Sequence, residues 1–231
     1  IDQPYVSKFC PGWAITISLE PTMEFEERCG MSTSTRNAAK KIWPYHLPDY
    51  NSEMLAKLLF CFENEPNKKD HVSGAQDAIG ICVPGLCRHF YDNNYWPEKI
   101  ETCHDESVLS WLEEHICMEP MFPRRPGTSV VDGCDLSVDN VHALTAAAER
   151  CWDAIMRKDL RDFAAAYQAS FEAQIRLFPG MMAEGVAENI EKYKNRALAW
   201  KMPGAGGGGY LAMVCERPWE GSIRIKIRRG T

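Results

Sequence analysis

The chain contains the stretch Gly204-Ala205-Gly206-Gly207-Gly208-Gly209, which is followed directly by an apolar run from Tyr210 to Cys215. Glycine loses more conformational entropy on folding than any other residue, so five glycines in six positions destabilise a fold unless the backbone needs positive φ or a close approach. A flexible linker is the alternative. Linkers usually join domains, whereas this stretch joins a predicted helix to a predicted strand. We therefore interpret it as a functional loop.

The segments around this loop predict a layer of helices on a sheet. Ser137 is a candidate N-cap, and Leu136 and Val141 stand at the positions of a hydrophobic staple, so a helix should begin there. Further helices are predicted from Leu160 to Phe178 and from about Met182 to Ala199, and strands from Tyr210 to Cys215 and from Ser222 to Arg228. Helices stacked on one side of a mostly antiparallel sheet make the α+β class.

The N-terminal half carries a comparable pattern. Alternating residues predict a strand from Trp13 to Leu19, and helices are predicted from Ser34 to Trp43, from Glu53 to Glu65 and around Ser107 to His115. Most of the apolar stripe of the second helix is expected in the core; it consists of Leu55, Leu58, Leu59 and Phe62. The Pro-Arg-Arg-Pro-Gly segment that ends at Gly127 is the predicted domain junction. We expect two α+β domains, residues 1–128 and 129–231, each a mostly antiparallel sheet covered by helices on one side.

Composition excludes several classes of protein. The formal net charge of the 231 residues is -6, which gives no basic stripe for nucleic acid or an anionic membrane surface. The ten cysteines are scattered through segments that can build their own core, which favours free thiols and a cytoplasmic location over a disulfide scaffold. Their spacing, with that of the six histidines, indicates no zinc site. The chain begins at Ile1, and we expect that residues upstream have been removed.

Three further segments could carry chemistry. Gly30-Met31-Ser32-Thr33-Ser34-Thr35 leads into a predicted helix, where backbone N–H groups and the positive end of the helix dipole can bind a phosphate. A plain Ser/Thr cap is the alternative, and the segment is not a Walker loop, because it has no Gly-Lys-Ser/Thr ending. Asp77 lies in Ser73-Gly74-Ala75-Gln76-Asp77, and Glu63 lies near the end of the preceding helix. Taken singly, these two acids are typical of a turn residue and a solvated helix-end carboxylate.

Together, the four segments resemble GHMP kinases in type and order. Members of that family have a glycine- and serine-rich loop that opens a helix, then a helix glutamate, a Gly-x-x-Asp-Gln segment and a Gly-Ala-Gly-Gly-Gly-Gly loop. The opening Asp2-Gln3-Pro4-Tyr5 is similar to a sugar-contacting stretch of the fucose- and heptose-phosphate branch. The part from Leu144 to Val214, with Gln174 and Phe178-Pro179-Gly180, also resembles that branch.

The resemblance implies a two-domain α+β fold and a kinase that uses ATP and Mg²⁺. It assigns the ATP phosphates to Gly30, Ser32, Thr33, Ser34, Gly206, Gly207 and Gly208. It assigns magnesium to Ser34 and Glu63, the sugar to Asp2 and Tyr5, and the catalytic carboxylate to Asp77. Such a site suits phosphoryl transfer. That reaction needs the attacking and leaving oxygens in line, neutralisation of the negative charge on the transferred phosphoryl group, and one base near the attacking hydroxyl. The implied partner is a monosaccharide or a sugar phosphate.

The sequence departs from the family pattern at several positions. Ser32 stands where the family usually has glycine, Thr35 where it has serine or alanine, and Ala78 where it has glutamine. The interval from Asp2 to Gly30 is also short for the family. A pseudokinase or ligand-binding protein of the same fold is therefore the main alternative, and a helical interaction domain with a glycine-rich hinge is a third. The sugar, the hydroxyl and the oligomeric state stay open.

Overall fold

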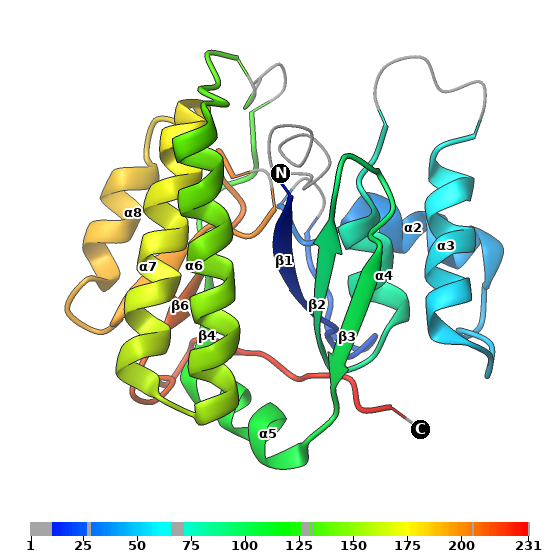
Figure 1. Ribbon diagram of the computed structural model, residues 1–231. Coiled ribbons are helices and arrows are strands. Elements are labelled where there is room, and N and C mark those ends of the chain that lie inside the picture. Colours follow the sequence, from blue (N-terminus) through cyan, green and yellow to red (C-terminus); the bar gives the residue numbers. More distant parts are fainter. Residues whose placement is uncertain are drawn as a thin grey trace.

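The chain forms two antiparallel β-sheets with helices packed around them, which is the predicted α+β class (Figure 1). The computed structural model describes residues 11–26, 29–65, 72–125, 130, 132–204 and 206–230. The predicted sugar contacts Asp2 and Tyr5 lie outside the described residues.

The first sheet has the strand order β1-β2-β3. Its strands are β1 (Gly12–Ile17), β2 (Leu86–Tyr91) and β3 (Lys99–Cys103), paired so that Gly12 faces Tyr91 and Leu86 faces Cys103. One face is covered by α2 (Thr33–Ile42), α3 (Ser52–Glu63) and α4 (Ala75–Cys82). Leu59, Ile79 and Tyr91 are fully buried between these helices and the sheet.

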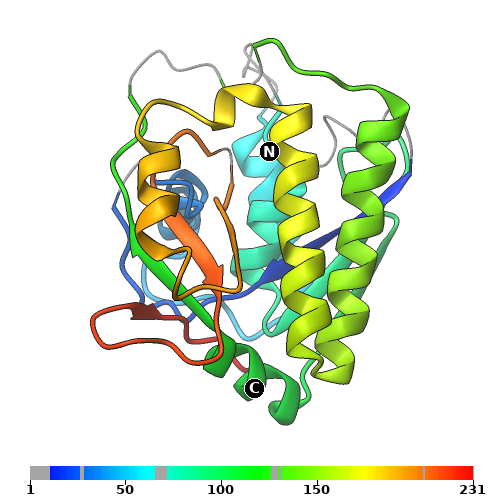
Figure 2. The same ribbon diagram turned by 90° about the vertical axis from the view of Figure 1, so that its left-hand side faces the viewer.

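The second sheet has the order β5-β6-β4-β7. Its strands are β5 (Ala199–Lys201), β6 (Tyr210–Val214), β4 (Ile116–Pro120) and β7 (Ile223–Arg224). The accompanying helices are α5 (Glu106–His115), α6 (Val138–Arg157), α7 (Leu160–Leu177) and α8 (Val186–Tyr193), with a 3-10 turn at Pro179–Met181. Figure 2 shows α6 and α7 running side by side as the two longest helices.

The two sheets are joined in two ways. Helix α6 also packs against β1, so the first sheet lies between α4 on one face and α6 on the other, rather than being covered on one side only (Figure 1). The C-terminal segment crosses from the second sheet to the first, where the Arg228 N–H donates to the Ser18 carbonyl at 2.8 Å and the Gly85 N–H donates to the Arg228 carbonyl at 2.9 Å. Strand β4 precedes residue 128, so a boundary there would cut through the second sheet. The two-domain division stays a prediction.

Several predicted elements differ from the observed ones. The helix predicted from Met182 to Ala199 spans only α8, because Gly185 at φ +89° begins it and Ala199 already belongs to β5. The strand predicted from Ser222 to Arg228 is limited to β7, although Ile227 forms an isolated bridge with Leu19. In α3, Leu55 and Leu59 are buried as predicted, whereas Leu58 and Phe62 are 52% and 48% exposed. The sequence reasoning did not find α4 or strands β2 to β5.

Candidate active site

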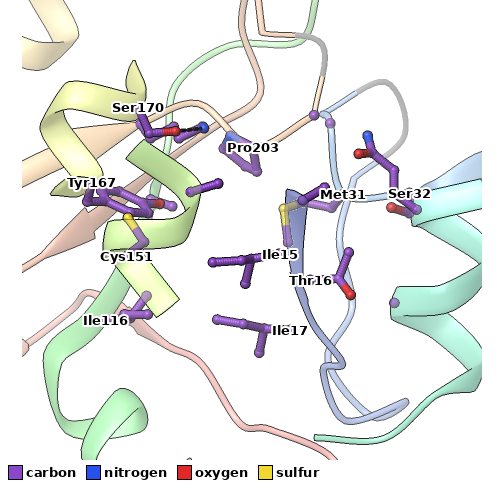
Figure 3. Close-up of a pocket in the computed structure, with 18 of the residues that line it drawn as sticks. Ile15, Thr16, Ile17, Met31, Ser32, Ile116, Cys151, Tyr167, Ser170 and Pro203 are labelled. Atoms are coloured by element: carbon purple, nitrogen blue, oxygen red, sulfur yellow. Dashed lines mark hydrogen bonds between the residues drawn. The ribbon is translucent and has the colours of Figure 1, made fainter. Parts of the chain in front are cut away.

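A cavity of about 350 Å³ lies between the two sheets. In Figure 3, Ile15 and Ile17 of β1 stand in its middle, Tyr167 and Ser170 of α7 on one side, and Ser32 at the start of α2 on the other. Of the residues predicted from sequence, Gly30, Ser32 and Asp77 line this cavity. Segments about 50 residues apart in the chain therefore meet at one place, as a binding site requires.

Helix α2 begins at the cavity. Its N-cap residue Ser32 has φ +54° and ψ +30°, in the left-handed region, and its side chain makes no capping hydrogen bond. A residue with a side chain is strained in this region, whereas glycine is not. The family's usual glycine at this position thus has a physical reason, and Ser32 carries a cost that glycine would avoid. The first N–H groups of α2 have no partner within the helix and can bind an anion.

The glycine-rich loop packs against the start of this segment, backbone to backbone. A Cβ added at Gly30, whose φ is +75°, would lie 2.6 Å from the carbonyl oxygen of Pro203. One added at Gly204 would lie 2.7 Å from the carbonyl oxygen of Gly30. Distances this short do not occur between real atoms of these types, so the two loops can approach only because both residues are glycine.

The other loop glycines have a different environment from the predicted one. Gly206, Gly207 and Gly208 are absent from the cavity lining. The Gly207 N–H donates to the Met181 carbonyl at 3.0 Å, so in this structure it does not face a ligand. All three have positive φ, and a Cβ at Gly208 would lie 2.6 Å from the Phe122 carbonyl oxygen. Their phosphate-binding role stays a prediction, while their need for glycine already follows from the fold.

The predicted magnesium pair is also arranged differently from the expectation. Ser34 is exposed, whereas its neighbour Thr35 is buried and donates its hydroxyl to Glu63 Oε1 at 2.8 Å. The hydroxyl that reaches Glu63 is therefore that of Thr35, because one residue along a helix turns a side chain by about 100°. Thr33 lies beside them at the first position of α2. None of these four residues lines the cavity.

Asp77 is the carboxylate of the N-terminal wall, the part of the cavity lining that comes from residues 13–81. It lies in the first turn of α4, where the helix dipole favours a negative charge. Arg36 of α2 also lines this part of the cavity. Burial lowers the pKa of Arg36, and the charge of Asp77 acts in the opposite direction, as expected for an opposite charge nearby. The charges of Asp77 and Arg36 therefore attract each other beside the start of α2.

The opposite wall carries a polar group that the sequence reasoning did not single out as a site. Lys201 of β5 donates from Nζ to Ser170 Oγ at 2.6 Å, and burial lowers the Lys201 pKa to about 8. Gln174, one turn along α7 from Ser170, donates from Nε2 to the Gly204 carbonyl at 3.4 Å. The available signal was the spacing of Tyr167, Ser170 and Gln174, which places three residues with polar groups on one face of the helix.

Within the described ranges, no three His, Cys, Asp or Glu side chains gather closely enough to hold a metal ion on their own. Magnesium in phosphoryl-transfer sites is usually held by one or two carboxylates together with phosphate oxygens, so such a cluster is not required. The cysteines of the described segments have free thiols. In the part of the chain that the structure covers, no helix has the length and apolarity needed to cross a lipid bilayer.

Part of the chain is similar in sequence to a curated protein. No protein-family model matches the chain. A stretch of 74 residues is 35% identical to the L-fucokinase/L-fucose-1-P guanylyltransferase of Bacteroides fragilis, covering 32% of this chain and 8% of that protein. The chain therefore spans a small part of this curated relative.

Comparison of structures places the fold among known kinases. A D-glycero-D-manno-heptose 1-phosphate kinase from Bacteroides thetaiotaomicron matches with a TM-score of 0.54 and 12% identity, covering 93% of this chain and 83% of that one. The mevalonate kinase of Methanococcus jannaschii matches at 0.56 and 17% identity, covering 82% and 58%. The galactokinase of Lactococcus lactis matches at 0.53 and 16% identity, covering 84% and 60%. Although the chain spans only about three fifths of two of these kinases, it has the GHMP kinase-like fold that its sequence motifs predict.

Proposed function

We propose that this chain forms the acceptor and phosphate-loop region of an ATP- and magnesium-dependent kinase that phosphorylates a hydroxyl of a monosaccharide or sugar phosphate in the cytoplasm. The observation that carries the proposal is the convergence of Gly30, Ser32 and Asp77 on one cavity, in a fold shared with small-molecule kinases. Phosphoryl transfer uses backbone N–H groups that bind phosphates and a carboxylate near the nucleophile. This site offers the start of a helix, two turns that require glycine and the carboxylate of Asp77.

The residues of the N-terminal wall fit a bound nucleotide phosphate. The Gly30 turn has no room for a Cβ, and the first N–H groups of α2 follow it directly. We assign Gly30, Ser32, Thr33 and Ser34 to the phosphates, with the loop from Gly206 to Gly208 beside them. Since Glu63 accepts a hydrogen bond from Thr35, we assign magnesium to Glu63 with Thr35 as the neighbouring hydroxyl, in place of Ser34. When bound, magnesium-ATP supplies the phosphoryl group and neutralises its charge.

Asp77 is assigned to the acceptor hydroxyl. As that oxygen forms its bond to the γ-phosphorus and the bond to the leaving ADP oxygen breaks, the hydroxyl proton passes to an Asp77 carboxylate oxygen. Arg36 also lines the cavity, and its positive charge attracts that carboxylate. Asp2 and Tyr5 remain assigned to the sugar on the strength of the sequence resemblance alone.

The test separates nucleotide binding from turnover. Magnesium-ATP at a hundredfold excess over its Kd should stabilise the protein by about 2.7 kcal/mol, seen as a raised melting temperature. A panel of hexoses, deoxyhexoses and heptose phosphates is then screened by coupled ADP release. Asp77→Asn should lower kcat by about 100- to 10,000-fold and leave the magnesium-ATP shift unchanged.

Three outcomes would contradict the proposal. Absence of a thermal shift at millimolar magnesium-ATP would favour a ligand-binding protein of the same fold. A shift without turnover of any sugar in the panel would favour a pseudokinase. Turnover by Asp77→Asn above half the wild-type rate would remove Asp77 from its catalytic role.

A further inference from the structure

We propose that Lys201 and Ser170 form a subsite for a phosphate monoester on the acceptor, with Gln174 as a hydrogen-bond acceptor for an adjacent sugar hydroxyl. The substrate is then a sugar phosphate rather than a neutral sugar. This inference rests on the proposed function, because it concerns the acceptor of that reaction. It starts from the wall of the cavity opposite Ser32 and Asp77.

Lys201 is a cation in apolar surroundings. It lies on β5 opposite Ala212 of β6, which in turn lies opposite Met118 of β4, and all three residues line the cavity. Removal of an ammonium group from water is costly unless an anion compensates for it. None of the described carboxylates forms an ion pair with Lys201, which donates to the neutral Ser170 hydroxyl instead. An anionic ligand would supply the missing charge.

The position of Ser170 suits the same ligand. Its oxygen accepts from Lys201, so its own proton is available to a second acceptor in the cavity. Figure 3 shows Ser170 on α7 beside Tyr167, with the hydrogen bond to Lys201 dashed. An ammonium group and a hydroxyl donor 2.6 Å apart can both donate to the oxygens of one phosphate.

Gln174 adds an independent observation. The residue is 7% exposed, and its Oε1 is buried without a hydrogen-bond partner among the described residues. A buried amide oxygen in this state costs free energy that a donor from a ligand would recover. The Gln174 Oε1 atom would repel the oxygens of a phosphate, but it can accept a hydrogen bond from a sugar hydroxyl. Ser170 and Gln174 are four residues apart on α7, so the wall offers donors and an acceptor next to each other, which matches a phosphate beside a sugar hydroxyl.

The charges facing Lys201 agree with this assignment. Cys151 of α6 is the titratable group that interacts with Lys201, and Tyr167 of α7 lies beside Ser170 (Figure 3). Burial raises the pKa of both Cys151 and Tyr167, that of Cys151 to about 12. Both are therefore neutral at pH 7, while Lys201 is protonated. On the opposite wall, the single charges of Arg36 and Asp77 balance, so the uncompensated positive charge of this lining is that of Lys201.

The test uses inorganic phosphate and acetate as probes, titrated by calorimetry with the nucleotide site filled by magnesium and a non-hydrolysable ATP analogue. Wild type should bind phosphate in the millimolar range and acetate more weakly. Lys201→Met should weaken phosphate binding at least about tenfold, as expected for loss of a charged hydrogen bond. Ser170→Ala should weaken it less, and Lys201→Arg should retain most of it. Lys194→Met is the matched control, because Lys194 is an exposed lysine of the same region, paired with Glu191.

A second measurement needs no variant. Inorganic phosphate should protect Lys201 of the wild-type protein from acetylation by acetic anhydride, read by mass spectrometry, and leave Lys194 unprotected. Equal phosphate affinity in wild type and Lys201→Met, or equal acetylation of Lys201 with and without phosphate, would overturn the subsite. Tighter binding of acetate than of phosphate would overturn the assignment to a phosphate ester. If magnesium-ATP produces no thermal shift while Lys201 still binds phosphate, the proposed kinase function fails and the subsite stands.

Discussion

The close approach of the two loops predicts a specific stability difference between two glycine-to-alanine variants. Gly30 and Gly133 have nearly the same backbone conformation, with φ of +75° and +70°. A Cβ at Gly30 would lie 2.6 Å from the Pro203 carbonyl oxygen, whereas one at Gly133 would meet nothing within 4 Å. Alanine at either position pays the cost of the left-handed region, about 1–2 kcal/mol. Only Gly30→Ala must also push a backbone oxygen from 2.6 Å to an ordinary contact of at least 3.4 Å.

Overpacking of this kind costs a further 1–3 kcal/mol or so. We therefore expect Gly30→Ala to lower the free energy of unfolding by about 2–5 kcal/mol and Gly133→Ala by about 1–2 kcal/mol. Urea unfolding measures both free energies, provided that the slope of free energy against urea concentration is the same for the variants and the wild type. A loss of 1 kcal/mol corresponds to a fall of about 2–4 °C in melting temperature for a chain of this size. Equal destabilisation of the two variants would refute the backbone contact between the loops.

Three further predictions concern the site. Ser32→Gly should leave the melting temperature unchanged or raise it, because it relieves the left-handed strain at φ +54°, whereas Ser32→Val should lower it; a stabilised valine variant would contradict this geometry. Thr35→Val should reduce the thermal shift by magnesium-ATP more than Ser34→Ala does, since Thr35 and not Ser34 contacts Glu63; the reverse order would restore Ser34 as the metal neighbour. The affinity for inorganic phosphate should fall as pH rises from 7 to 9.5, because Lys201 loses its proton near pH 8. Phosphate becomes more negative over the same range, which alone would strengthen its binding to a cation, so a fall must come from Lys201. A constant affinity in calorimetry would argue against Lys201 as the cation.

The fold class and the two longest helices could be predicted from local sequence. The expected helix from Leu160 to Phe178 corresponds to α7, Leu160–Leu177, because an apolar stripe and the Pro179-Gly180 stop both act locally. Strands β2 and β3 were missed for a physical reason. The sequence of β2 is LCRHFY, where Arg88 pairs with Glu101 of β3, and His89 is buried and neutral, with burial lowering its pKa to about 3. A strand whose polar residues are paired or buried has no simple alternation to detect.

The candidate site also contains features that local sequence predicts and features that depend on tertiary packing. The glycine turns were identifiable because glycine at a turn has local meaning. Asp77 was singled out only through the family resemblance, because α4, in whose first turn it lies, was not predicted. The choice of Thr35 over Ser34 depends on how α2 is rotated against α3, and no spacing rule gives that angle. Lys201 could not be identified because its orientation depends on the register of β5 against β6, in which Lys201 faces Ala212. A shift by one residue would have turned its side chain to the other face.

Two contacts join segments that line the cavity. In the first, Gly30 and Gly204 bring two backbones together. In the second, the C-terminal segment pairs with the residues after β1 through the Leu19–Ile227 bridge, and Arg228 Nη2 donates to the carbonyl of Ile81, itself a lining residue, at 2.8 Å. Asp77 lies on α4, which packs against the first sheet, whereas Lys201 lies on β5 of the second. In the proposed reaction, the distance between the acceptor hydroxyl and its phosphate subsite therefore depends on both contacts. Substitutions at these contacts should therefore change substrate selectivity without touching the substrate, whereas substitutions within one wall should change affinity for one end of it.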